Sequence, residues 1–220
     1  MRFLTVTWAL AWRDLRVELR GRELLPSIAQ FIVLALVIAN FAFDLDQASV
    51  KRVSSGVLWL VLVFAGLVVF SRTFAGEREG GTLDAMLLTP ATHAAILTGK
   101  ALAQSAVLLA CELVLLPAMA VFLGAPIGPA EFGVVALAVV GMAILGCLFS
   151  ALASQTRARE LLLPVLALPL WIPYVVLGGG LLQQVQQQLP IPVQPLIALV
   201  YMDILFLMLT AVVARFVLDD

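Results

Sequence analysis

Six long apolar stretches constrain this 220-residue chain more than any other feature of its sequence. A hydrocarbon core about 30 Å thick needs about 20 apolar residues for each helical crossing. With 63% hydrophobic and 12% charged residues and a mean hydropathy of +1.09, a soluble fold would expose very large apolar patches. The sequence therefore predicts an all-α membrane protein with six transmembrane helices. They are expected at residues 24–43, 53–74, 102–123, 132–153, 161–182 and 196–217.

The basic residues lie almost entirely between alternate crossings. Eleven of the thirteen Lys and Arg residues fall on one side of the predicted bundle, and only Lys51 and Arg52 fall on the other. Because Lys and Arg resist translocation, the richer side is predicted to be cytoplasmic, with both termini on it. The first apolar stretch follows a charged segment and lacks a small-residue cleavage site, so it is expected to act as an uncleaved anchor.

The connections between crossings are too short to form a catalytic domain. Residues 1–220 are therefore predicted to form a single transmembrane domain. The segment 2–22 before the first crossing is amphipathic, with an arginine stripe on a face separate from its apolar face. We expect it to lie in the bilayer interface, although packing against a partner is an alternative. Its apolar face consists of Leu4, Trp8, Trp12, Leu15 and Leu19.

The fifth predicted crossing carries residues that bend helices. Pro164, Pro169 and Pro173 interrupt it, and the glycine run 178–180 is expected to end it. Each proline removes a backbone hydrogen bond, which hydrocarbon tolerates only where neighbours satisfy the freed carbonyl groups. A conformationally active helix and a static kink that shapes the packing are both compatible with this pattern. The polar segment 183–195 that follows is expected outside the membrane, with no regular structure assigned.

Two acidic residues lie at membrane depth, Glu112 in the third crossing and Asp203 in the sixth. Inserting an ionised carboxylate into hydrocarbon costs roughly 2.5–3.5 kcal/mol. Both side chains are therefore expected to line a polar path or to contact a partner subunit. A protonated structural acid is the alternative for each, and a shallow position near the interface is a further alternative for Asp203.

Several kinds of chemistry have no support in this sequence. A Gly-Lys pair precedes the third crossing, but Ala94 and Ala101 replace the glycine and the Ser/Thr that a phosphate-binding loop requires. The single histidine, His93, is expected to be a loop residue, and Cys111 and Cys147 to be buried, apolar-like residues. No Cys/His cluster suggests zinc, and no Ser/His/Asp set is possible. We therefore predict no catalytic residues and no metal site.

The connection 76–92 is the most informative polar segment. Gly80 and Gly81 form a flexible turn, Thr82 is a good N-cap, and Pro90 would stop the short helix that follows. Asp84 falls in the first turn, where the helix dipole favours an anion. One side of this helix is apolar, so we expect it to insert into a groove of another protein. That side consists of Leu83, Met86, Leu87 and Leu88.

This connection also carries a resemblance. The segment Glu77-Arg78-Glu79-Gly80-Gly81-Thr82-Leu83-Asp84, continued by Leu87-Leu88-Thr89-Pro90 and then Gly99-Lys100, resembles the cytoplasmic coupling segment of type-2 ABC transporter permeases. Within that superfamily the chain resembles the CcmB family of haem exporter proteins in cytochrome c maturation. Its length, the run 56–59 that ends in Trp59, and the proline-rich run 161–173 favour this family.

The resemblance implies a type-2 ABC exporter-like permease subunit in the bacterial inner membrane that is not itself an enzyme. ATP hydrolysis would reside in a separate cytoplasmic ATPase, whose closure residues 77–90 would transmit. Implied partners are a haem-handling membrane protein, a small accessory membrane subunit and a haem chaperone, with no nucleic acid. Haem would be a transported or handed-over substrate and not a bound cofactor. A type-2 exporter for lipid, polysaccharide or drug is an alternative, as is a scaffold or channel.

Overall fold

The computed structural model describes residues 2–21, 24–43, 47–74, 86, 88–89, 91–156 and 159–218. Over these ranges the chain is almost entirely helical and contains no strand. The long helices are α1 (Arg2–Gly21), α2 (Leu24–Phe43), α3 (Gln47–Thr73), α6 (His93–Leu123), α7 (Pro129–Ser154), α8 (Arg159–Gln186) and α9 (Val193–Leu218).

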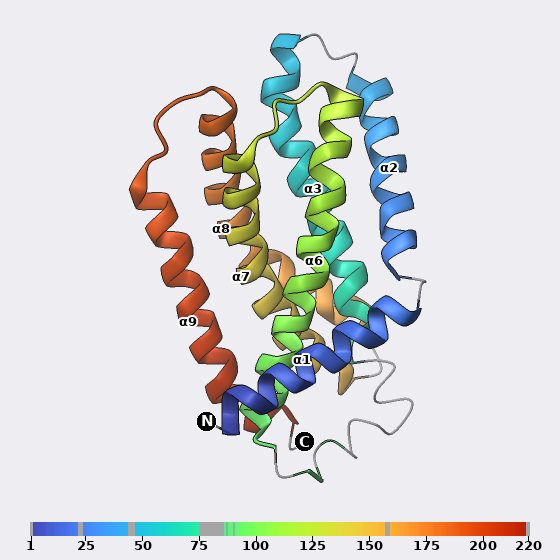
Figure 1. Ribbon diagram of the computed structural model, residues 1–220, viewed down its shortest axis with the longest axis vertical. Helices are drawn as coiled ribbons and strands as arrows, with labels where there is room; N and C mark the ends of the chain where they lie inside the picture. The colour runs from blue at the N-terminus through green and yellow to red at the C-terminus, as the bar shows by residue number, and fades with distance from the viewer. Residues whose placement is uncertain are drawn as a thin grey trace.

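Six of the described helices, all except α1, are long and apolar enough to cross a membrane. They run along the long axis of the molecule, and α1 lies across their lower end (Figure 1). The end that carries α1 is called the α1 end below. This arrangement confirms the predicted all-α membrane fold with an amphipathic helix before the first crossing.

Helix α7 lies at the centre of the bundle and packs against α3, α6, α8 and α9. The Phe70 ring of α3 lies directly against Gly146 of α7, where a Cβ atom would overlap it. The Trp171 indole of α8 contacts that ring in a tilted arrangement, with an interplanar angle of 58° and centroids 5.8 Å apart. Its Nε1 donates to the Met142 carbonyl oxygen at 3.1 Å. Small residues on α7 thus let aromatic rings from two neighbouring helices enter the core.

Helix α8 corrects one prediction about its end. It continues through Pro164, Pro169 and Pro173 and also through the glycine run 178–180, and it ends at Gln186. The Trp59 indole of α3 packs directly against Gly178, where a Cβ atom would overlap the ring. The glycines therefore form a packing surface inside the helix, where we expected a helix end.

Helix α6 corrects a second prediction. It begins at His93, nine residues before the expected start of the crossing, so His93 is a helical residue and not a loop residue. Thr92 is the N-cap, and its side-chain oxygen accepts a hydrogen bond from the Ala95 amide. Hydropathy locates only the part of a helix that hydrocarbon surrounds, and this first part of α6 packs against α1 instead.

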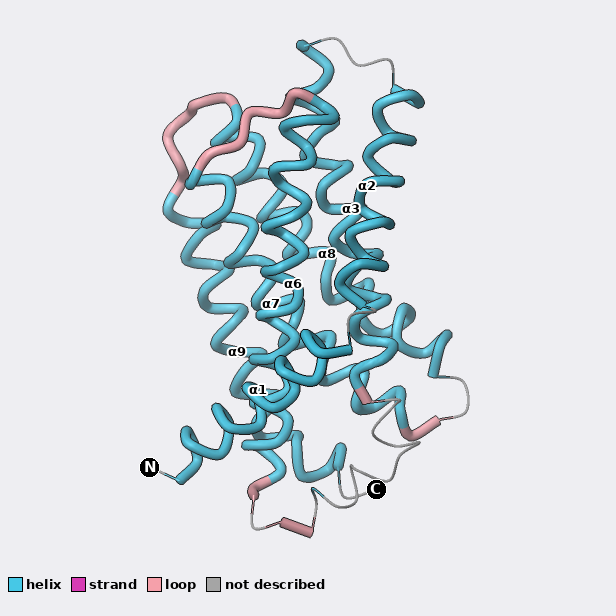
Figure 2. The backbone as a smooth tube through the Cα atoms, turned by 45° about the vertical axis from the view of Figure 1, so that its right-hand side comes forward, coloured by secondary structure: helices cyan, strands magenta, loops and turns pink. Residues whose placement is uncertain are grey.

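The connections at the two ends of the bundle differ. The loops 124–128 and 187–192 lie at the end opposite α1 (Figure 2). Gly124 closes α6 in the left-handed conformation with φ of 65°, and its amide donates to the Met119 carbonyl. The start of α6 and the final turns of α9 lie at the α1 end (Figure 1).

Candidate functional site at the junction of α1, α3 and α6

Helix α1 crosses α6 in close contact at Gly99. A Cβ atom at this glycine would lie 2.9 Å from the Thr7 carbonyl oxygen and 3.0 Å from the Leu10 Cβ, both on α1. Any larger residue would push the two helices apart, because backbone atoms of α1 cannot move independently of the helix. The glycine of the Gly-Lys pair is thus where the helix across the bundle end meets the first turns of α6.

The lysine of the same pair stabilises the contact between α1 and α6. Lys100 Nζ lies 3.1 Å from Asp14 Oδ2, and the two side chains are 4% and 13% exposed. The same ammonium group lies over the Phe74 ring at the end of α3, 4.9 Å from its centroid. Asp14 also accepts from Arg13 Nε at 3.1 Å. Lys100, which precedes the predicted third crossing, is thus a buried residue of α6 that joins α1, α3 and α6.

Part of the predicted coupling segment contacts this junction. Met86 is 7% exposed and accepts a hydrogen bond on its sulfur from Arg13 Nη1 at 3.1 Å. It belongs to an apolar cluster with Phe74 and Ile96. Leu88, in contrast, is 89% exposed. The apolar side expected to face a partner is therefore divided, with Met86 packed against its own chain and Leu88 facing outward.

Most of the coupling segment is not placed by the structure. Leu88 is the one predicted coupling residue that lies within the described ranges. The remaining predicted coupling residues lie outside them, namely Glu77, Arg78, Glu79, Gly80, Gly81, Thr82, Leu83, Asp84, Leu87 and Pro90.

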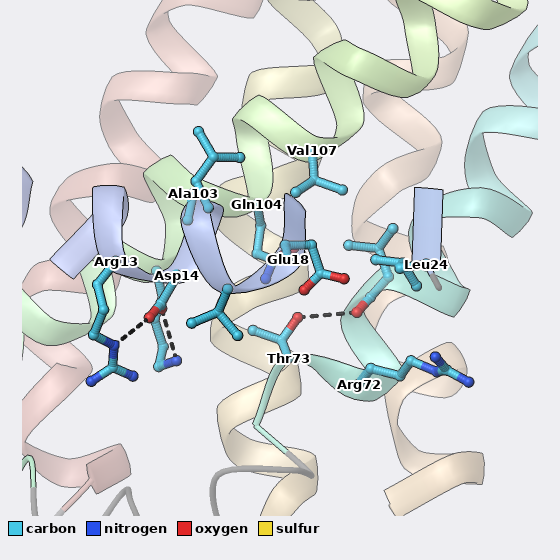
Figure 3. Close-up of a pocket in the computed structure, with 13 residues that line it drawn as sticks. Arg13, Asp14, Glu18, Leu24, Arg72, Thr73, Ala103, Gln104 and Val107 are labelled. Atoms are coloured by element: carbon cyan, nitrogen blue, oxygen red, sulfur yellow. Dashed lines mark hydrogen bonds and ion pairs between the residues drawn. The ribbon is translucent and has the colours of Figure 1, made fainter. Parts of the chain in front are cut away.

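A cavity of about 480 Å³ lies beside this junction. The side chains of Glu18, from α1, and Gln104, from α6, lie next to each other in it (Figure 3). Thr73 closes the lower side, where its hydroxyl donates to the Val69 carbonyl oxygen at 3.1 Å. The full lining consists of Arg13, Asp14, Leu15, Val17, Glu18, Leu24, Val69, Arg72, Thr73, Lys100, Ala103, Gln104 and Val107.

The electrostatics of this cavity centre on Glu18. Burial raises the pKa of the Glu18 carboxyl group above its ordinary value, the Arg72 guanidinium opposes this shift, and the Asp14 carboxylate adds to it. Gln104 is 8% exposed, and its Oε1 atom has no hydrogen-bond partner among the described residues. The cavity therefore presents acceptor oxygens that its own walls satisfy poorly.

The two acids predicted at membrane depth lie outside this cavity. Glu112 on α6 is 2% exposed, and neither carboxylate oxygen has a partner among the described residues. Asp203 on α9 and the Tyr174 ring on α8 both meet Gly141 of α7, where a Cβ atom would overlap them. Asp203 thus lies at a three-helix contact, whereas Glu112 is an isolated buried acid.

The three predicted kink residues stay on α8 and are not part of the junction. Pro169 and Pro173 face outward from the bundle, and Pro164 is half-buried. Within the described ranges, no group of three His, Cys, Asp or Glu side chains could hold a metal ion.

Sequence reasoning missed the residues that build the junction. Asp14 is an acid among the arginines of α1, a signal for an ion pair that the pattern alone cannot assign to a partner. Glu18 follows it by four residues and therefore shares its helical face. Gln104 lies four residues after Lys100, on the same face of α6, so the spacing could have grouped them. Pro117 inside α6 was also overlooked.

Six membrane-crossing helices with an amphipathic helix across one end define a multi-pass, all-α membrane protein with the architecture of a permease. Comparison with known families identifies it further. The family model described as "CcmB protein" matches residues 5–218. The chain belongs to the CcmB family.

Relatives of known name agree with this assignment. "Heme exporter protein B" of Rhodobacter capsulatus is 32% identical over 189 residues, which cover 84% of this chain and 86% of the relative. The protein of the same name from Pseudomonas aeruginosa is 27% identical over 180 residues, or 81% of each chain. The "Probable ABC transporter permease protein NosY" of Pseudomonas aeruginosa is 29% identical over 190 residues, or 79% of this chain and 68% of the relative. The names of these relatives thus describe haem exporter proteins and an ABC transporter permease.

Proposed function

We propose that this chain is the permease subunit of an ABC transporter that exports haem, or releases holo haem chaperone, during cytochrome c maturation. Membership of the CcmB family and the names of its relatives support the haem substrate. The second candidate, a type-2 permease for another substrate, is supported by the similarity to the NosY permease. In both cases a separate ATPase subunit would supply the energy.

The observation that carries the coupling proposal is the Asp14–Lys100 junction. A force applied to the segment 76–92 would act on Met86, which contacts Arg13 of α1. The same force would act along the chain on the start of α6. Lys100 would pass that motion to α1 and α3 at once, because its ammonium group binds Asp14 and lies over Phe74. We propose that an ATPase docks at the α1 end, on Leu88 and its neighbours in the segment.

This docking implies an orientation and a set of partners. The α1 end would face the cytoplasm of a bacterial cell, with both termini there and the chain in the inner membrane. The distribution of Lys and Arg supports this orientation. A second membrane protein and a small accessory subunit would handle haem. The haem chaperone would receive it on the outer side of the membrane.

The coupling proposal is tested by substituting the apolar side of the segment. Leu83→Asp and Leu87→Asp should each abolish co-purification of the ATPase while membrane insertion stays normal, since a charge cannot enter an apolar groove without a partner. Leu189→Asp, in a loop at the opposite end of the bundle, is the matched control and should retain the ATPase. Wild-type recovery of the ATPase with both segment variants would refute the docking site.

The haem proposal is tested in cells. Deletion of the gene should abolish the c-type cytochromes that a haem stain detects on a denaturing gel, and the wild-type gene should restore them. An unchanged stain would favour the second candidate, a permease for another substrate.

The proposal assigns Glu112 and Asp203 to a polar path or a subunit contact. Glu112→Gln and Asp203→Asn preserve the shapes of the side chains and remove their ability to ionise. We expect normal amounts of protein in the membrane and a reduced level of c-type cytochromes in at least one variant. Normal levels in both variants would show that the two acids are structural.

A further inference from the structure

The cavity at the junction contains acceptor groups that lack a suitable donor. Asp14 is already bound by Lys100 and by Arg13. Glu18 and Gln104 face the cavity next to each other (Figure 3), and Gln104 Oε1 is buried without a partner among the described residues. A buried acceptor that gains no hydrogen bond costs roughly 1–3 kcal/mol. A cation with several N–H donors, positioned between these two side chains, would satisfy both.

Arg72 supplies the opposite charge at the rim of the same cavity. Its exposed side chain points away from Glu18 (Figure 3), so its guanidinium group is available to an anion from solvent or membrane. Arg13 and Lys100 in this lining both bind Asp14. The remaining acid, Glu18, with Arg72 at the rim, matches a zwitterion whose ammonium group enters first and whose phosphate remains outside. Guanidinium groups bind phosphate oxygens in favourable bidentate geometry.

The position of the cavity indicates the source of this zwitterion. It opens beside α1, whose Trp8, Trp12 and Leu19 side chains are exposed as expected for a helix at headgroup depth. Its wall includes the first residue of α2, Leu24, and the apolar side chains Val69 and Val107 of the neighbouring crossings. Its volume falls within the range of about 300–1,000 Å³ typical of small-molecule sites.

We propose that this cavity binds the headgroup of phosphatidylethanolamine, with the ammonium group between Glu18 and Gln104 and the phosphate on Arg72. The primary amine is essential, because the trimethylammonium of phosphatidylcholine cannot donate N–H hydrogen bonds. Phosphatidylglycerol carries no cation for Glu18. Burial is the main cause of the raised pKa of Glu18, and the Asp14 carboxylate adds to it. An ammonium group beside Glu18 would oppose this shift. The bound lipid would join α1, α3 and α6.

The test is native mass spectrometry of the purified full-length chain in detergent, with each lipid added at equal concentration. We expect phosphatidylethanolamine to bind about five- to tenfold more than phosphatidylglycerol or phosphatidylcholine, as for one charge-assisted contact. Soluble phosphoethanolamine should not displace it, because the source is the membrane lipid. Equal binding of the three lipids, or full displacement by the soluble headgroup, would overturn the proposal without any variant.

Two variants locate the site. Glu18→Gln should reduce the preference for phosphatidylethanolamine to less than about twofold, and Gln104→Leu should weaken it as well. Glu131→Gln is the matched control, because Glu131 caps Gly128 at the start of α7 and the glutamine oxygen can still accept that bond. It should bind lipid as the wild type does. A preference unchanged in Glu18→Gln, or lost equally in the control, would contradict the assignment.

Discussion

At the scale of single residues, the Asp14–Lys100 pair is the contact on which the junction depends most. The Lys100 side chain is 4% exposed, so its ammonium group has lost most of its hydration, and the Asp14 carboxylate and the Phe74 ring are among the groups that replace it. Removing one partner of such a pair costs more than the pair contributes, because the remaining charge stays buried. The two partners differ in burial, because the Lys100 side chain is 4% exposed, whereas Asp14 is also bound by the Arg13 side chain, which is 44% exposed.

This difference leads to an asymmetric prediction. Asp14→Asn leaves the Lys100 ammonium buried without its carboxylate, so α1 should detach more readily and tryptic cleavage at Arg13 and Arg16 should become on the order of tenfold faster. Lys100→Met removes the buried charge itself, and Asp14 keeps Arg13, so cleavage should change much less. Limited proteolysis in detergent measures both rates. Equal acceleration in the two variants would contradict the buried-charge explanation.

The junction also shows what the sequence could reveal at this scale. The apolar face and the arginine stripe of α1 follow from its own periodicity, and the exposure of Trp8 and Trp12 agrees with them. The pairing of Asp14 with Lys100 does not, because it joins residues 86 positions apart. In the sequence, the Gly-Lys pair is part of a segment that resembles a family motif. Its role in helix packing depends on α1 lying against Gly99, a contact that the sequence pattern does not reveal.

At the scale of helices, the contact of α3 with α8 depends on the glycine run 178–180. Ser55 Oγ donates to the Gly179 carbonyl oxygen at 3.3 Å, and Ser54 Oγ donates to Gln186 Oε1 at 3.1 Å. Next to these bonds, the Trp59 indole of α3 lies on Gly178 of α8. The two helices are thus fixed by hydrogen bonds near one end and by an aromatic ring on a glycine surface.

The same glycines provide a matched pair of variants. Gly178→Ala should force Trp59 out of its position and lower the free energy of unfolding by about 1–3 kcal/mol, as overpacking does. That loss corresponds to a fall in apparent Tm of several degrees, at about 2–4 °C per kcal/mol. A Cβ at Gly180 meets nothing within 4 Å, so Gly180→Ala should be neutral or slightly stabilising. Thermal unfolding followed by tryptophan fluorescence measures both, and equal Tm values would contradict the packing role.

Helix boundaries were predictable to different degrees. The bounds of α2 agree with the prediction because this helix carries no charged residue along its length. The starts of α6 and α3 were placed too late, since hydropathy does not report helical turns that extend beyond the membrane or pack on α1. The end of α8 was misplaced because glycine in a membrane helix serves helix contact as often as it serves termination, and Trp59 lies far away in the sequence.

At the scale of the whole molecule, the alternation of basic segments and the path of the chain agree. The loops 124–128 and 187–192 lie at one end of the bundle, and α1 lies at the other with the start of α6 (Figures 1 and 2). The proposed coupling segment 76–92 links α3 to α6, whose start lies at the α1 end (Figure 1). The proposed coupling requires this end to face the cytoplasm, where an ATPase can reach it.

Cysteine labelling of intact cells tests this most directly. In a background in which the buried thiols of Cys111 and Cys147 are replaced by alanine, Gly80→Cys and Gln188→Cys are treated with a membrane-impermeant maleimide. We predict that the cysteine at position 188 reacts in intact cells, whereas the one at position 80 reacts only after the cells are made permeable. Labelling at position 80 from outside intact cells would contradict the proposed coupling to a cytoplasmic ATPase.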